Sequence, residues 1–144
     1  MITGHFGTDG KPYVKSQQVI PSLSVRGDVE FLLDTGSDRT SLHPLDSLAL
    51  RVPYAQLGNP MYFAGIGGSQ AYFTADAALL FRDEIQDRLY FLRVAIARPS
   101  QHNLQLPSLL GQDILRHWRT IHDPTERALE FTVRRSDGTV MLQP

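Results

Sequence analysis

Short segments rich in β-branched, aromatic and aliphatic residues occur along the whole chain, and glycine or proline often interrupts them. Segments of this composition and length are typical of β-strands. The strand-like segments are 2–6, 13–20, 29–33, 61–81, 88–97, 127–133 and 139–144. Helical periodicity is scarce: residues 44–50 could form one short helix, and residues 112–118 are the better candidate. The sequence therefore predicts a mostly β, largely antiparallel domain with one helix near its C-terminal end.

Turn-forming residues predict how these segments connect. Residues 7–12 have the composition of a hairpin connection between the first two segments, and Asp137-Gly138 is a hairpin turn signal between the last two. Segment 61–81 contains two strand-like arms around a glycine-rich turn. Residues 29–33 are apolar at nearly every position, which predicts a central strand that is buried on both faces.

Composition narrows the class of protein. The length of 144 residues, 42% apolar and 20% charged, predicts a single globular domain covering 1–144. The net charge of −1 gives no sign of nucleic-acid binding, and the arginine pairs Arg116/Arg119 and Arg134/Arg135 are interpreted as isolated, solvated surface.

The chain has no cysteine, which excludes disulfides, thiolate metal sites and a cysteine nucleophile. No apolar run approaches the length of a membrane span, and the N-terminal residues lack the pattern of a secretory signal. These features together predict a cytoplasmic location.

The first candidate motif follows the strand 29–33. Three apolar residues lead directly into Asp34, although burying an ionised carboxylate is costly unless it is paired or protonated. Gly36 would let the chain turn tightly, and the hydroxyls of Thr35 and Ser37 could hydrogen-bond the loop. Taken alone, the motif is also typical of an ordinary turn at the end of a strand.

Two further motifs follow along the chain. Gly65, Gly67 and Gly68 surround Ile66 at the tip of a predicted hairpin, without the Gly-Lys-Ser/Thr ending of a phosphate-binding loop. The third motif, Leu109-Leu110-Gly111, lies immediately before the predicted helix. Each motif also has an ordinary structural interpretation, as a hairpin turn and as a strand-to-helix junction.

The order of the three motifs resembles the retropepsin family, the single-domain aspartic proteases related to retroviral proteases. The resemblance extends from about Val29 to about Trp118, and residues 10–25 resemble the first strands of bacterial retropepsin-like proteins. It implies a closed antiparallel β-barrel with a flap hairpin and one short C-terminal helix. The implied activity is that of an aspartic endopeptidase, with a peptide or protein as substrate and without a metal or cofactor.

The resemblance also implies a homodimer, because the chain has one Asp-Thr-Gly loop and such a site needs two. Asp34 would meet Asp34 of a second chain, and the two carboxylates would share a proton and activate a water molecule. Thr35 would hold the opposite loop and Gly36 would lie near the substrate. Ser37 could hydrogen-bond the catalytic carboxylate, and Asp38 would meet the substrate backbone.

The other two motifs take roles by the same resemblance. Residues 65–68 match the tip of the flap that covers the substrate, and Leu109, Leu110 and Gly111 match the segment that supports the catalytic loop. One residue departs from the retroviral pattern: Gln112 stands where an arginine usually pairs with the acid at the Asp38 position. A neutral amide cannot form that charge-assisted pair. Arg39 or Arg116 could replace it.

Two other hypotheses stay open from the sequence. One is a retropepsin-fold interaction or dimerisation module that is catalytically weak because the two aspartates do not assemble. The other is an unrelated small β-barrel binding domain in which the three motifs lie on different faces. The sequence gives less support for a metal site or a serine nucleophile. The five histidines show no metal-binding spacing, and no Gly-x-Ser-x-Gly motif is present. Asp113 is interpreted as an acid stabilised at a helix N-terminus.

Overall fold

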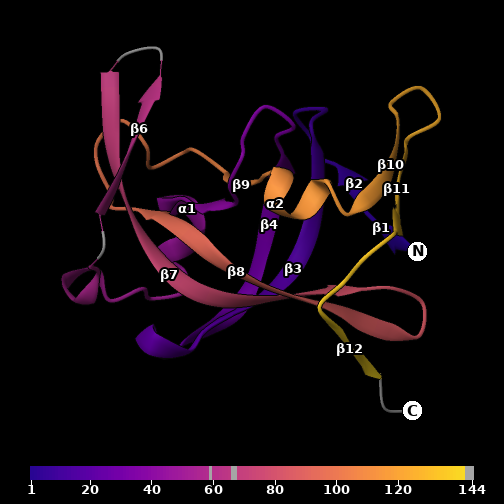
Figure 1. The fold of residues 1–144 in the computed structure, drawn as a ribbon. Helices are drawn as coiled ribbons and strands as arrows, with labels where there is room; N and C mark the ends of the chain where they lie inside the picture. Colours follow the sequence, from indigo (N-terminus) through magenta and orange to yellow (C-terminus); the bar gives the residue numbers. More distant parts are fainter. Residues whose placement is uncertain (59, 66–67, 142–144) are drawn as a thin grey trace.

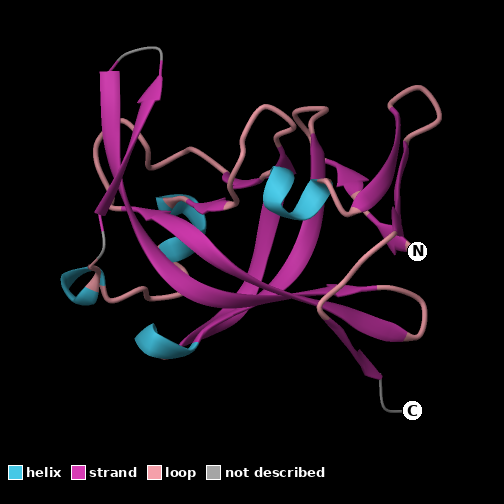
Figure 2. Ribbon diagram, in the orientation of Figure 1, coloured by secondary structure: helices cyan, strands magenta, loops and turns pink. Residues whose placement is uncertain are grey.

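The computed structural model describes residues 1–58, 60–65 and 68–141 (Figure 1). The structure is mostly β, as predicted, and its helices are single turns (Figure 2). The elements in order are β1 (Ile2–Thr3), β2 (His5–Phe6), β3 (Pro12–Ile20), the 3-10 turn η1 (Pro21–Leu23), β4 (Val25–Leu33), β5 (Ser41–Leu42), α1 (Pro44–Ser47), the 3-10 turn η2 (Tyr54–Gln56), β6 (Pro60–Gly65), β7 (Gly68–Arg82), β8 (Gln86–Ala97), β9 (Ser108–Leu110), α2 (Gln112–Leu115), β10 (Trp118–Asp123), β11 (Ala128–Val133) and β12 (Gly138–Met141).

Six strands close into a barrel. Each strand in the order β7, β8, β5, β9, β4 and β3 pairs with the next, and β3 pairs with β7 again. The predicted closed barrel is thus confirmed. Its pairings are antiparallel except for β4 with β9 and β5 with β8, which are parallel. The strand β9, from late in the chain, lies between β4 and β5, parallel to β4 and antiparallel to β5.

Alternating burial shows how the strands form the core. In β3, Val14, Ser16, Gln18 and Ile20 are buried while the residues between them are more exposed, so one face of the strand points into the barrel. Residues 29–33 form the end of β4, a central strand between β3 and β9 as predicted. The predicted burial on both faces is wrong, because Val29 and Phe31 are buried whereas Glu30, on the other face of the strand, is exposed. Phe31, near its end, is fully buried.

A second sheet covers one end of the barrel. It has the order β1-β11-β10. Trp118 of this sheet packs against Phe81 of β7 and Tyr90 of β8, and Phe131 packs on Trp118. The Trp118 Nε1–H donates to the Tyr90 hydroxyl at 2.7 Å, and that hydroxyl donates to the Arg135 carbonyl oxygen at 2.7 Å. These contacts tie the C-terminal segment to the barrel.

Two predictions about the C-terminal part were wrong. The predicted hairpin around Asp137-Gly138 does not form, because β11 pairs with β1 and β10 whereas β12 pairs with β8. Asp137 directs the chain to β8: its N–H donates to the Leu89 carbonyl oxygen, and its carboxylate accepts from the Phe91 N–H at 2.8 Å.

The predicted helix 112–118 ends early, at Leu115. Leu110, Ile114 and Trp118 are all buried, as their four-residue spacing suggested, but they belong to β9, α2 and β10 respectively. Trp118 pairs with Val133 in the second sheet and fills the aromatic cluster, so tertiary packing overrides the helical pattern.

Candidate functional site

The loop that contains Asp34 begins where β4 ends, on the side of the barrel from which the β6–β7 hairpin also rises (Figure 1). The Asp34 N–H donates to the Leu110 carbonyl oxygen at 3.0 Å, which continues the parallel pairing of β4 with β9 by one residue. The buried strand therefore fixes the backbone of Asp34. Its side chain is half-buried.

A tight turn follows Asp34. The Ser37 N–H donates to the Asp34 carbonyl oxygen at 3.1 Å, and the Gly36 N–H donates to the Asp34 carboxylate at 3.1 Å. Thr35, Gly36 and Asp38 are exposed. Within the chain, the Ser37 hydroxyl donates to the Arg39 carbonyl oxygen at 2.8 Å, so it braces the loop and does not contact the Asp34 carboxylate.

The N-terminal residues of α2 hold the loop from behind. The backbone N–H of Gln112 donates to the Ser37 carbonyl oxygen at 2.8 Å, and its side-chain amide donates to the Thr35 carbonyl oxygen at 2.9 Å. The Asp113 N–H donates to the Asp38 carbonyl oxygen at 3.2 Å. The residue that replaces the usual arginine thus contacts the loop backbone directly.

Asp113 makes contacts that the sequence interpretation missed. Its two carboxylate oxygens accept from the Thr40 hydroxyl at 2.6 Å and from the Thr40 N–H at 2.9 Å. Thr40 is fully buried, and its hydroxyl oxygen accepts from the Gly111 N–H at 3.2 Å. Asp113 therefore ties the end of the loop to α2. In the sequence, the only sign of this contact is that an acidic residue, Asp113, directly follows the neutral Gln112.

Gly111 allows this close approach. A Cβ atom at this position would lie 2.5 Å from the carbonyl carbon and oxygen of Arg39, closer than real atoms approach. The two residues before it, Leu109 and Leu110, pair with Leu32 and Leu33 of β4. The loop and its support thus form one packed unit.

Asp38 has no ion-pair partner among the residues that the structure describes. Arg116 instead donates from its Nε–H to the Gln112 carbonyl oxygen at 2.7 Å. Neither arginine that could have replaced the missing partner does so within this chain. The carboxylate of Asp38 is left exposed.

The glycine-rich hairpin is formed by β6 and β7, with Gly65 paired to Gly68. Ile66 and Gly67 lie outside the described residues. Tyr72 marks the base of the hairpin, because it is the first residue of β7 that pairs with β8, opposite Ala97. The arms beyond Tyr72 pair with each other.

A buried polar cluster lies below this base. His43 Nε2 is 3.1 Å from the Tyr72 hydroxyl oxygen, and the two rings meet edge to face. The His43 N–H donates to the Ser108 hydroxyl oxygen, which in turn donates to Asp46 at 2.6 Å. Burial lowers the pKa of His43 and raises the pKa of Asp46, because each loses hydration of its charged form. The cluster links the hairpin, α1 and β9.

The described residues contain neither a metal-binding cluster nor a membrane-spanning helix. No group of three or more His, Asp or Glu side chains in this part of the chain could hold a metal ion. None of the helices among residues 1–58, 60–65 and 68–141 is both long and apolar enough to span a membrane.

Comparison with solved structures identifies the fold. The chain is similar to a retropepsin-like aspartic protease from Rickettsia conorii, with 17% sequence identity, a TM-score of 0.56, and coverage of 90% of this chain and 95% of that one. It also matches EIAV protease in complex with the inhibitor HBY-793, with 20% identity, a TM-score of 0.44, and coverage of 77% and 90%. No family model and no curated protein matches. The fold is retropepsin-like, as the resemblance implied.

Proposed function

We propose that the chain is one half of an aspartic endopeptidase, with Asp34 as its catalytic residue. The observation that carries the proposal is the braced loop after β4: a half-buried carboxylate on an otherwise exposed turn, held by β9 and α2 within a retropepsin-like fold. Fold alone does not carry activity, so the assignment depends on the carboxylate of this loop.

In the proposed enzyme, two copies of the chain face each other with their Asp34 loops. Two carboxylates about 3 Å apart cannot both be ionised, so they share one proton. One carboxylate takes a proton from a water molecule, which attacks the scissile carbonyl carbon, while the protonated carboxyl donates a hydrogen bond to the carbonyl oxygen. The proton then passes to the leaving amine. No covalent intermediate forms between enzyme and substrate.

The neighbouring residues would position the substrate. Thr35, Gly36 and Asp38 follow Asp34 in the loop and are exposed, and their backbone groups would meet an extended peptide. The hairpin of residues 65–68 would cover the peptide from the other side. Thr35 would contact the loop of the second copy.

The variant Asp34→Asn tests this proposal. We expect it to lose peptide cleavage by at least about a thousandfold, because an amide cannot act as the base, while thermal stability changes little. A pool of unbiased peptides, incubated at pH 3 to 8 and analysed by mass spectrometry, measures cleavage. Cleavage retained by pure Asp34→Asn would refute the assignment.

A second candidate is a retropepsin-fold interaction module with weak or no activity. The pairing of the terminal strands favours it: β1 pairs with β11 and β12 pairs with β8 inside the same chain, so these strands are already engaged. In retroviral members of the family that the sequence resembles, interleaved terminal strands staple the dimer, and here another surface would have to do so. A chain that stays monomeric in sedimentation at assay concentrations, and cleaves no peptide, supports this candidate.

A further inference from the structure

The structure brings together two arginine pairs that are separate in the sequence. Arg116 follows α2, Arg119 lies in β10, and Arg134 and Arg135 follow β11. The His117 carbonyl oxygen accepts hydrogen bonds from the N–H groups of both Arg134 and Arg135, at 2.8 and 3.3 Å. The interpretation of the pairs as isolated is therefore wrong. These four residues, Arg116, Arg119, Arg134 and Arg135, are called the arginine cluster below.

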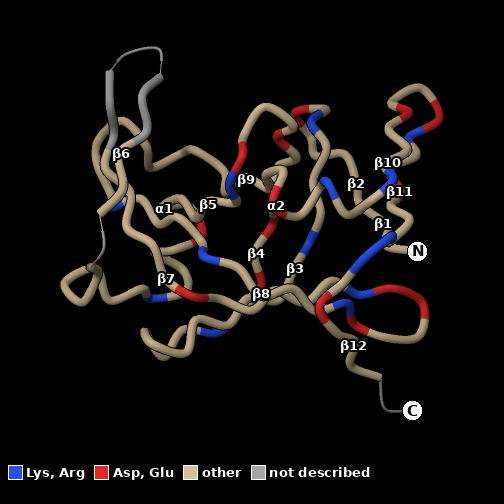
Figure 3. The backbone as a smooth tube through the Cα atoms, viewed as in Figure 1, with Lys and Arg blue, Asp and Glu red and all other residues tan. Residues whose placement is uncertain are grey.

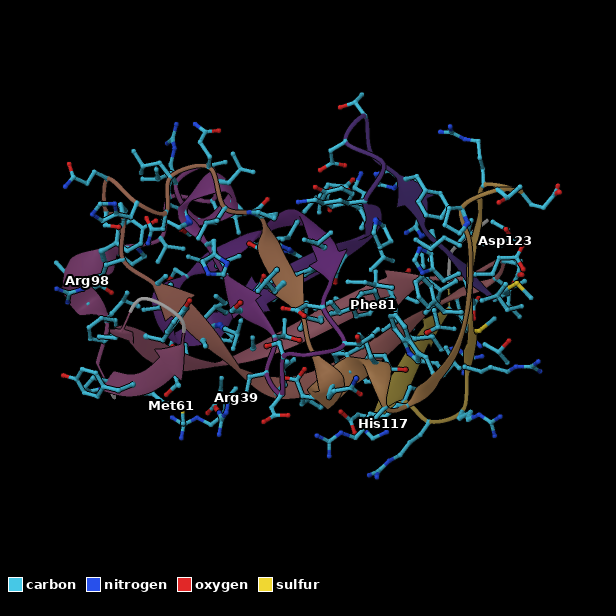
Figure 4. The ribbon with its side chains drawn as sticks, turned by 90° about the horizontal axis from the view of Figure 1, so that it is seen from above. Arg39, Met61, Phe81, Arg98, His117 and Asp123 are labelled. Atoms are coloured by element: carbon cyan, nitrogen blue, oxygen red, sulfur yellow. The ribbon has the colours of Figure 1, made fainter. Side chains whose placement is uncertain are left out.

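All four side chains face solvent. Each is exposed, and Arg119 pairs with the exposed Thr132 on the outer face of the second sheet, opposite to the face that carries the buried Trp118 and Phe131. Figure 4, which labels His117, shows side chains that end in nitrogen extending outward along that edge of the molecule. The cluster is thus open to a partner.

The cluster lacks internal neutralisation. Among the described residues, none of the four guanidinium groups forms an ion pair, and the one side-chain hydrogen bond found is that of Arg116 to a backbone oxygen. Figure 3 shows basic positions near α2, β10 and the segment after β11. Four unpaired positive charges in a chain of net charge −1 concentrate a positive potential on one side.

The cluster lies next to the proposed catalytic loop. Arg116 contacts Gln112, and Gln112 contacts Thr35, so two contacts connect the cluster to the residue after Asp34. Arg116 is thus the member of the cluster that lies nearest to the loop along these contacts. Planar guanidinium groups bind carboxylates with two parallel hydrogen bonds.

We infer that the arginine cluster is a docking surface for an acidic segment of a polypeptide, outside the catalytic cleft. Resting on the proposed function, this assigns the substrate class as proteins with a run of Asp or Glu beside the cleaved bond. Nucleic acid is the less suitable partner, because tight phosphate-backbone binding uses about six to ten contacts and this surface offers four arginines.

Binding to a labelled probe tests the inference without any need for activity. The probe is a fluorescent peptide of alternating Glu and Gly, its control has Gln in place of Glu, and fluorescence polarisation measures both. We expect the acidic peptide to bind at least about tenfold more tightly than the neutral one, and rising ionic strength to abolish the difference.

Two variants with matched charge locate the binding. One changes Arg116, Arg119, Arg134 and Arg135 to Gln, and the other changes four exposed cations elsewhere, namely Lys11, Arg26, Arg51 and Arg98. Both take the net charge from −1 to −5. We expect the first to lose about tenfold or more in affinity and the second less than twofold. Equal loss in both variants, or no loss in the first, would overturn the inference.

A single-stranded DNA probe of equal charge distinguishes the partner class: binding as tight as that of the acidic peptide contradicts a polypeptide partner. Failure of the inference and failure of the proposed function are separable. If the parent chain binds the acidic peptide but cleaves no peptide, the docking surface is supported and the protease activity is refuted. If it cleaves peptides without preference for acidic ones, the protease activity is supported and the docking surface is refuted.

Discussion

Asp113 accepts two hydrogen bonds from Thr40, and both donors belong to a fully buried residue. Removing the carboxylate would leave these donors without partners, which costs roughly 1–3 kcal/mol for each buried group. We therefore expect Asp113→Ala to lower the free energy of unfolding by about 2–6 kcal/mol. Urea unfolding followed by fluorescence of Trp118, the one tryptophan of the chain, measures the loss.

The variant Asp113→Asn keeps the size of the side chain and one acceptor oxygen, so we expect it to fall between the parent and Asp113→Ala. Asp28→Ala is a suitable control, because it removes an exposed carboxylate whose ion pair with Lys15 contributes little. If Asp113→Ala is no less stable than Asp28→Ala, the contacts with Thr40 do not hold the loop.

Where α2 begins, its first turn packs directly on the backbone of the Asp34 loop, and this approach depends on Gly111. A methyl group there would lie 2.5 Å from the backbone of Arg39, so either the loop or the helix must move. We expect Gly111→Ala to destabilise the fold by about 1–3 kcal/mol, the usual cost of overpacking, and to displace the loop. The change in amide hydrogen exchange at residues 34–40 reports the displacement.

The matched control for this element is Gly138→Ala in β12. A Cβ atom at Gly138 would lie 3.5 Å from the Leu89 side chain, an ordinary van der Waals distance. We expect this variant to remain within about 0.5 kcal/mol of the parent, as most substitutions away from packed features do. Equal stability of the two alanine variants would show that the junction between α2 and the loop is not tightly packed.

The sequence predicted local elements well and long-range partners poorly. The strand before Asp34, the glycine-rich hairpin and the Leu-Leu-Gly support were all recognised, because each has a composition that determines its local conformation. The pairing of β12 with β8 was not recognised, because it depends on the contact of Asp137 with β8. The early end of α2 was not recognised either, because it depends on the contact of Trp118 with Tyr90 of β8. Local propensity contains no information about such contacts.

The same limit applies to the candidate site. The Asp34 loop was found from its motif, but the contact of Asp113 with Thr40 joins residues 73 positions apart and has no local signature. The arginine cluster was not predicted for the same reason. The two pairs are brought together by backbone hydrogen bonds from Arg134 and Arg135 to the His117 carbonyl oxygen, and His117 belongs to neither pair. Side-chain networks of this kind become visible only when the strands are placed.

The stability of the whole molecule should respond to the buried cluster around His43. Burial lowers the pKa of His43 in the folded chain, whereas in the unfolded chain it returns to about 6.5. As pH falls through that value, the unfolded chain binds the proton first, so the free energy of unfolding decreases. Asp46 acts in the opposite sense at lower pH, because its pKa is raised by burial and protonation then favours the folded chain.

We therefore expect stability to decline between pH 7 and pH 5 in the parent chain, and His43→Gln to reduce this decline, since glutamine can still bond the Tyr72 hydroxyl but does not titrate. Urea midpoints from Trp118 fluorescence at half-unit pH steps measure the slope. Asp46→Asn is the control, because it leaves the titrating imidazole of His43 in place and removes only the compensating gain that Asp46 contributes as pH falls. An unchanged slope in His43→Gln means that another group causes the decline and that the histidine is not held neutral by its burial.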